Sequence, residues 1–123
     1  MISKKFKTPI YGIEFEVVIF DNEKEFDEKF KDFDFKVNPK DFTGCVFSKD
    51  QKLYMTLSAE EDGYPTPGLI AHESLHLMNE IFINISHFKS DRNNDEPDAY
   101  LLSWIVNRIH ELINSKENNK NKK

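Results

Sequence analysis

The first half of the chain alternates apolar and polar residues, and this pattern predicts a strand followed by a helix. From Ile10 to Phe20 apolar residues recur at every second position, as expected for a strand with one buried face. Asp21 or Asn22 can then cap a helix, because their short polar side chains accept from free backbone N–H groups. The phenylalanines that follow recur on one helical stripe, before Asn38-Pro39 ends the segment. These phenylalanines are Phe26, Phe30 and Phe33.

Two more strands and two helices follow in the pattern. Thr43–Ser48 and Lys52–Ser58 are short alternating runs around Lys49-Asp50, which predicts a β-hairpin. From 66 to 85 the apolar residues change to a helical period, with a threonine cap and a proline in the first turn. A second helical pattern runs from 96 to 113. This order predicts an α+β fold with a small, mainly antiparallel sheet packed on helices.

The first of these two helices contains the motif H-E-x-x-H, written by His72, Glu73 and His76. Histidines four residues apart lie on one helix face, so both imidazoles can reach one metal ion. Glu73 is then placed to take a proton from water at that metal. A zinc site needs at least one more protein ligand, and Glu96 at the start of the next helix can supply it. We expect the two helices to be antiparallel, so that the second returns its first turn to the motif.

His72, Glu73 and His76 followed by Glu96 and Ala99 resemble the gluzincin branch of the zincin metallopeptidases. The resemblance covers about residues 53–113 and is closest to small single-domain zincins of phages and other mobile elements. It implies a zincin-like fold, one zinc ion held by two histidines and Glu96, and a peptide or protein as substrate. It also implies that Glu73 is the general base in peptide hydrolysis by a zinc-activated water.

Other features of that family are less well matched. Many gluzincins have an aspartate four residues after the glutamate ligand, where this chain has Tyr100, and Asp98 is near the ligand at a different spacing. Tyr64 and Tyr100 are candidates to donate to the developing oxyanion, although a packing role is the simpler interpretation of either. In zincins the strand before the active-site helix often pairs with extended substrate. That strand is here 53–58, which can instead be an ordinary internal strand.

Several other potential ligands are weaker candidates than Glu96. Glu80 is about 12 Å along the helix from His72, and His110 is about 21 Å along its helix from Glu96. His87 does not lie at the distance from His76 that a metzincin ligand requires, so we interpret it as a loop histidine. Cys45 follows a glycine as the ligand of peptide deformylases does, but the rest of that motif is missing and a small buried side chain is the simpler interpretation.

The charge, cysteine content and apolar stretches of the chain limit its expected partners and location. Residues 1–114 carry 13 basic and 21 acidic side chains, so the body of the protein is acidic and nucleic acid is not an expected partner. The single cysteine excludes an intramolecular disulfide, and no apolar stretch has the length of a membrane helix. We therefore expect a cytoplasmic monomer with one domain over 1–114 and a disordered, lysine- and asparagine-rich tail over 115–123. The alternative to a peptidase is a zincin-like binding or regulatory module, since so short a chain leaves little room for a substrate cleft.

Overall fold

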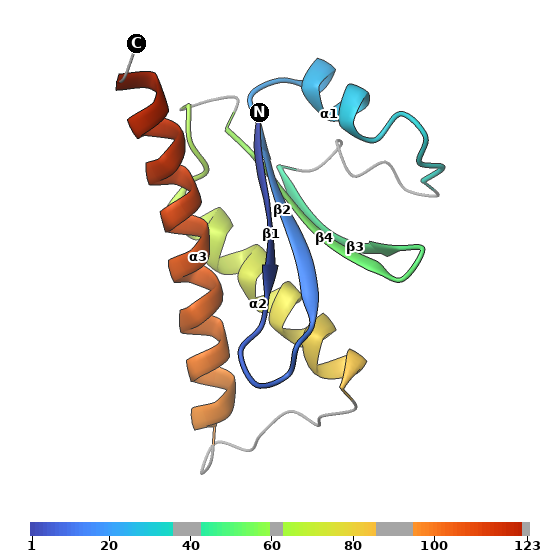
Figure 1. Cartoon of the computed structure of the whole chain (residues 1–123), viewed down its shortest axis with the longest axis vertical. Coiled ribbons are helices and arrows are strands. Elements are labelled where there is room, and N and C mark those ends of the chain that lie inside the picture. Colours follow the sequence, from blue (N-terminus) through green and yellow to red (C-terminus); the bar gives the residue numbers. More distant parts are fainter. Residues whose placement is uncertain (36–42, 60–62, 86–94, 122–123) are drawn as a thin grey trace.

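The computed structural model describes residues 1–35, 43–59, 63–85 and 95–121, the last six of these as backbone alone (Figure 1). The described chain forms an α+β structure with one four-stranded open sheet and three helices. In chain order the elements are β1 (Ile2–Lys7), β2 (Glu14–Phe20), α1 (Glu23–Lys29), β3 (Gly44–Lys49), β4 (Lys52–Ser58), α2 (Pro67–Asn84) and α3 (Glu96–Asn121).

The sheet consists of two hairpins joined side by side. Its strand order is β1-β2-β4-β3, with antiparallel pairs at both edges and a parallel pair, β2 with β4, at the centre. The prediction of a mainly antiparallel sheet is thus confirmed. The suggestion that residues 53–58 form a substrate-binding edge is wrong, because β4 lies between β2 and β3. The edges in the described chain are β1 and β3.

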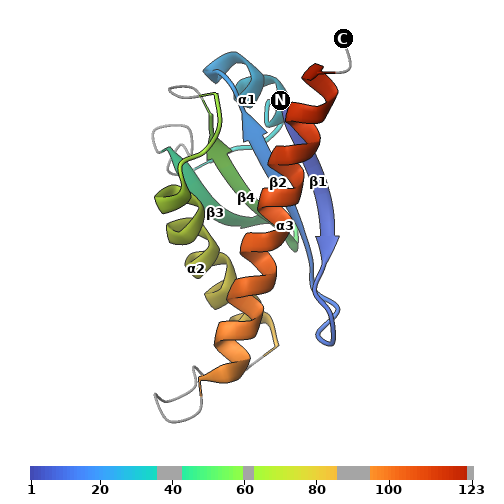
Figure 2. The ribbon, with the colours of Figure 1, turned by 90° about the vertical axis from the view of Figure 1, so that its left-hand side faces the viewer.

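The long helices α2 and α3 cover one face of the sheet, and the short helix α1 covers the other (Figures 1 and 2). Alternate residues along β2 therefore enter two different cores. Val17 and Ile19 pack against α2 and α3 in a largely aliphatic cluster, whereas Val18 and Phe20 pack with the phenylalanines of α1. This alternation is the consequence of the two-residue period of a strand.

The helix α2 begins where the sequence predicts. The Thr66 hydroxyl accepts a hydrogen bond from the Leu69 N–H at 3.2 Å, and Pro67 occupies the first helical position. Both features satisfy or remove backbone donors that the first turn of a helix leaves without partners. α1 starts in the same way, with Asn22 Oδ1 accepting from Glu25 N–H at 2.9 Å. It is shorter than the phenylalanine stripe suggests, since Phe30 is already its C-cap and Phe33 follows it.

Three further features depart from the sequence pattern or add to it. Strand β1 has no counterpart in the prediction. The hairpin turn consists of Asp50 and Gln51, both with positive φ, which is the backbone of a type I′ turn. The helix α3 continues to Asn121, well beyond the apolar pattern, so the predicted tail is helical in its backbone as far as the structure describes it.

In the described parts of the chain, no helix combines the length and apolar character needed to cross a membrane.

Candidate metal and catalytic site

The two motif histidines lie together on the solvent-facing side of α2. Their ring centroids are 4.9 Å apart, and 67% of the His72 side chain is exposed. This is the arrangement expected of histidines one helical turn apart. Neither ring is buried in the core, so both imidazoles are open to a metal ion or another ligand from solvent.

Glu73 points away from the exposed face and into the protein. Its residue exposure is 5%, and its Oε1 lies 3.8 Å from Nε2 of His72. Burial raises the pKa of the Glu73 carboxyl, while the neighbouring His72 and His76 counteract part of that effect. A buried carboxylate without a strong partner is costly, so its position beside two imidazoles is a reason to look for function here.

The first residue of edge strand β3 forms the opposite wall of the Glu73 environment. A Cβ atom on Gly44 would lie 2.8 Å from Glu73 Cγ and 2.9 Å from Leu69 Cδ1, closer than real side chains approach. Glycine at this position therefore allows β3 to pass directly over the carboxylate. In the sequence, the corresponding signal is a glycine at the start of a predicted strand, where glycine often marks the close approach of another segment.

Cys45 is half-buried beside this contact. Burial, and secondly the charge of Glu73, raise the pKa of its thiol. Its Sγ donates weakly to the Val46 carbonyl oxygen at 3.8 Å. A raised thiol pKa opposes formation of the thiolate that binds metals, which agrees with the interpretation of Cys45 as a packing residue.

Glu96 does not join the histidines in this structure. It is the exposed first residue of α3, whose first turn lies beyond the last turn of α2 in both views, whereas the histidines are in the first half of α2 (Figures 1 and 2). Among the described residues, no three His, Cys, Asp or Glu side chains gather closely enough to hold a metal ion. The structure thus brings together two of the expected zinc ligands and the expected base, and the role of Glu96 stays a prediction.

The remaining candidates lie before α2, along α3 and between the two helices. Tyr64 precedes α2 and is 51% exposed, and Tyr100 in α3 is 72% exposed, so neither is a core packing residue. Asp98 is 8% exposed and has interaction partners of its own. His110 is on the exposed side of α3, and His87 lies outside the described residues.

Searches of protein-family models, curated proteins and solved structures find no match to this chain. The resemblance to gluzincins therefore rests on the motif residues themselves. What this structure adds is their arrangement: two accessible imidazoles, a buried glutamate one position along the helix, and an edge strand directly above that glutamate.

Proposed function

We propose that the protein is a zinc-dependent peptidase of the gluzincin type, with a zincin-like fold, acting in the cytoplasm on a peptide or protein substrate. The observation that carries the proposal is the single turn of α2 in which exposed His72 and His76 flank buried Glu73. The histidines would hold the metal through neutral imidazole nitrogens. When bound, zinc supplies a Lewis acid that polarises a carbonyl oxygen and makes water a better nucleophile.

The chain's own residues have separate tasks in this proposal. Glu73 accepts a proton from the attacking water and returns it to the leaving amine, and its raised pKa suits proton exchange closer to neutral pH. Among the described strands none pairs with the outer edge of β3, so an extended peptide can add there as a further strand through backbone N–H and C=O groups. A peptide paired with β3 runs past Gly44 and therefore close to Glu73.

The second candidate is a binding or regulatory module that uses the same residues without catalysis. It is favoured by the absence of a third metal donor near the two histidines in the described part of the chain. Two exposed imidazoles form an incomplete site for catalytic zinc, which has three protein ligands. Two histidines alone can still bind a metal ion weakly, or a partner protein can supply the missing ligand to that ion.

Hydrolysis of a peptide library separates the two candidates. The variants are Glu73→Gln, which removes the base, and Glu80→Gln, a matched control one turn after His76 on the same helix. We expect both to fold and to retain the zinc content of the wild type, and Glu73→Gln to lower the cleavage rate roughly a hundredfold to ten-thousandfold. Equal cleavage by wild type and Glu73→Gln would remove Glu73 from catalysis. A zinc-loaded wild type that cleaves no member of the library would favour the binding module.

The third ligand needs its own measurement. If Glu96 completes the site in the metal-bound protein, Glu96→Ala weakens zinc binding in a competition assay with a chelator. Glu111→Ala, on the same helix but paired with Arg108 at 2.6 Å, is the control. Equal zinc affinity in both variants and the wild type would show that Glu96 is not a ligand.

A further inference from the structure

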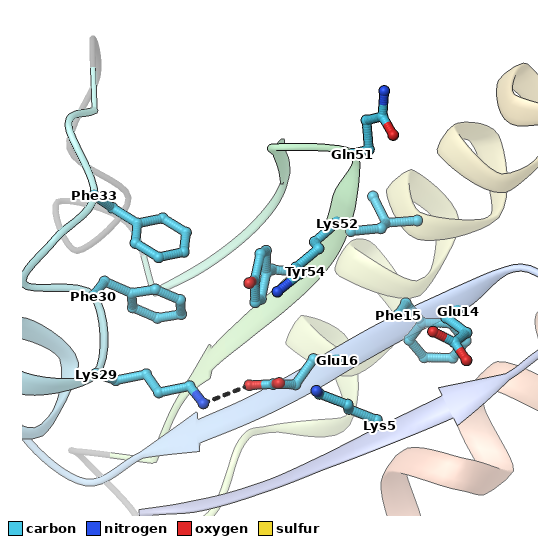
Figure 3. A pocket seen from close by; sticks show the side chains of 11 residues that line it. Lys5, Glu14, Phe15, Glu16, Lys29, Phe30, Phe33, Gln51, Lys52 and Tyr54 are labelled. Carbon is cyan, nitrogen blue, oxygen red and sulfur yellow. Dashed lines mark ion pairs between the residues drawn. The ribbon is translucent and has the colours of Figure 1, made fainter.

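A second candidate site lies on the opposite face of the sheet from the α2 and α3 helices. It is a pocket of about 340 Å³ between α1, the strands β1, β2 and β4, and the hairpin turn after β3. Its walls share no residue with the histidine motif. Figure 3 shows that most of its labelled side chains, from segments far apart in sequence, surround a common space, whereas Gln51 points away from it.

Three lysines, one from each of three elements, surround this pocket. Lys5 is on β1, Lys29 ends α1 and Lys52 begins β4, and the chain ends of all three reach toward the middle of the pocket (Figure 3). Lys29 Nζ lies 2.7 Å from Glu16 Oε2. Among the described residues, Lys5 and Lys52 have no such ion pair. Together with Glu14, the lining carries three cationic and two anionic side chains, a positive excess in a protein whose net charge is −5.

The register of the sheet explains how these charges meet. Lys5 pairs with Glu16 across β1 and β2, and Glu16 pairs with Tyr54 across β2 and β4, so the three side chains form one row on the α1 face. Glu16 is 8% exposed, and in the described part of the chain its Oε2 has no hydrogen-bond partner beyond the Lys29 ion pair. The Lys29 side chain beside this carboxylate keeps 29% exposure, so mainly the Glu16 charge of the pair is removed from water.

The other wall of the pocket is aromatic. Phe30, Phe33 and Tyr54 stand edge to face, with ring centroids 5.1–5.7 Å apart, and Phe33 is half-buried and open to the pocket side. Aromatic rings in such clusters accept a further ring in stacked or edge-to-face contact. The pocket therefore combines an apolar wall with a cationic rim, and its volume falls in the range of small-molecule sites.

We propose that this pocket binds a small aromatic anion, a ring that carries a carboxylate or a phosphate. The anionic group would contact Lys5 and Lys52, whose ammonium groups form no ion pair within 4.0 Å among the described residues, and the ring would pack against Phe33 and Tyr54. A purely structural role accounts for the Glu16–Lys29 pair, which ties α1 to the sheet. It does not account for two further lysines directed into the same space beside an aromatic wall. The proposal is independent of the histidine motif.

Ligand-observed NMR titration of the full chain tests the proposal with four probes. Phenyl phosphate and benzoate have both the ring and the charge, inorganic phosphate lacks the ring, and benzyl alcohol lacks the charge. We expect phenyl phosphate or benzoate to bind at least tenfold more tightly than either control probe, and more weakly as salt increases. Equal affinities for all four probes, or saturation by none, would overturn the proposal.

Substitutions place the binding in this pocket. Lys5 and Lys52 are exposed, so the double variant Lys5→Ala/Lys52→Ala should fold normally and bind the aromatic anion at least tenfold more weakly. The control variant is Lys24→Ala, on the exposed side of α1 and outside the pocket. It should bind the anion as the wild type does. Glu16→Gln should strengthen binding, because it removes a negative charge and releases Lys29. Loss of amide hydrogen-exchange protection in β2 would show that a variant had unfolded. Unchanged affinity in the folded double variant would disprove the site, and so would equal weakening by Lys24→Ala.

Discussion

The two faces of the sheet are built from different side chains and hold their charges differently. The face under α2 and α3 is aliphatic and large, and its buried carboxylate, Glu73, has two histidines as neighbours. The face under α1 is small and aromatic, and its buried carboxylate, Glu16, has a lysine 2.7 Å away. The face under α2 and α3 thus supplies most of the buried apolar surface, whereas the face under α1 has a pocket between its aromatic rings and lysines. The chemistry available on each face therefore depends on the side chains around its buried carboxylate.

The largest effect is expected where the aliphatic face is most completely buried. Ile81 in α2 has 0% exposure, so Ile81→Ala leaves a cavity that α2 and α3 cannot fill by relaxing. We expect the free energy of unfolding to fall by about 2–5 kcal/mol, as in other buried aliphatic deletions. Urea unfolding followed by circular dichroism measures it. A loss below 1 kcal/mol would mean that this face does not dominate stability.

The aromatic face should respond to a similar change more locally. Phe26 is buried in α1 and contacts the rings of Phe20 and Phe30 at 5.2 and 4.8 Å. We expect Phe26→Leu to cost about 1–3 kcal/mol and to speed amide exchange in α1 more than in β2 or α2. Native-state hydrogen exchange gives the comparison. Uniform acceleration in all elements would show that the two faces unfold as one unit.

Gly44 tests the contact between the edge strand and Glu73. Gly44→Ala inserts a Cβ 2.8 Å from Glu73 Cγ, so either β3 or the glutamate must shift. We expect a loss of about 1–3 kcal/mol in the free energy of unfolding, as for overpacked cores. Combining it with Glu73→Ala should remove part of that loss, because the 2.9 Å approach to Leu69 Cδ1 remains. A double-mutant cycle with no coupling would contradict the direct contact.

The pH dependence of stability distinguishes Glu73 from a surface carboxylate. Its pKa in the folded protein is raised above the usual 4.5, so the folded state binds this proton more tightly than the unfolded state does. The contribution of Glu73 to stability therefore becomes less favourable as pH rises above 4.5. In metal-free protein, we expect Glu73→Gln to gain stability over the wild type as pH rises from 4 to 7. Thermal melts at fixed ionic strength measure the difference, and a constant offset would contradict the raised pKa.

The smallest effect is expected at the tip of the β1–β2 hairpin, outside both faces. Ile10 is 97% exposed and has a φ of 69°, a left-handed conformation that a β-branched residue adopts only with strain. Ile10→Asn should stabilise the protein by about 1 kcal/mol, because asparagine tolerates this conformation. Ile10→Val, which keeps the branching, should change little. Equal stabilisation by both would attribute the gain to lost exposed apolar surface.

The elements that the sequence predicts are those with local signals. The α2 helix carries its cap at Thr66 and its proline at 67, and the turn residues between β3 and β4 separate two alternating runs. Strand β1 has no comparable signal, because lysines occupy three of its six positions and only Phe6 is buried. The parallel pairing of β2 with β4 is a long-range choice that no local pattern encodes, and it is what moves the free edge from β4 to β3.

Part of the candidate site is likewise predictable from local sequence signals, and part depends on long-range packing. His72, Glu73 and His76 are positioned by one helical turn, so their arrangement follows from sequence spacing and helix geometry. The position of Glu96 depends on the path between two helices, and residues 86–94 of that path lie outside the described chain. The lysine pocket could not be read from the sequence, since Lys5, Lys29 and Lys52 meet only through the strand order.

The parallel pair at the centre of the sheet also has a kinetic consequence. Each outer hairpin can close through a short turn on the microsecond timescale, but Phe15 must find Leu53, its partner in the central pair, across a long stretch of chain. Joining the hairpins loses more chain entropy than closing either turn, and ladders between distant segments slow folding. Folding should therefore proceed as two early local events followed by one slower docking step. The complete sheet on which α2 packs forms only in that last step. The row of Lys5, Glu16 and Tyr54 in the pocket under α1 is also completed only then.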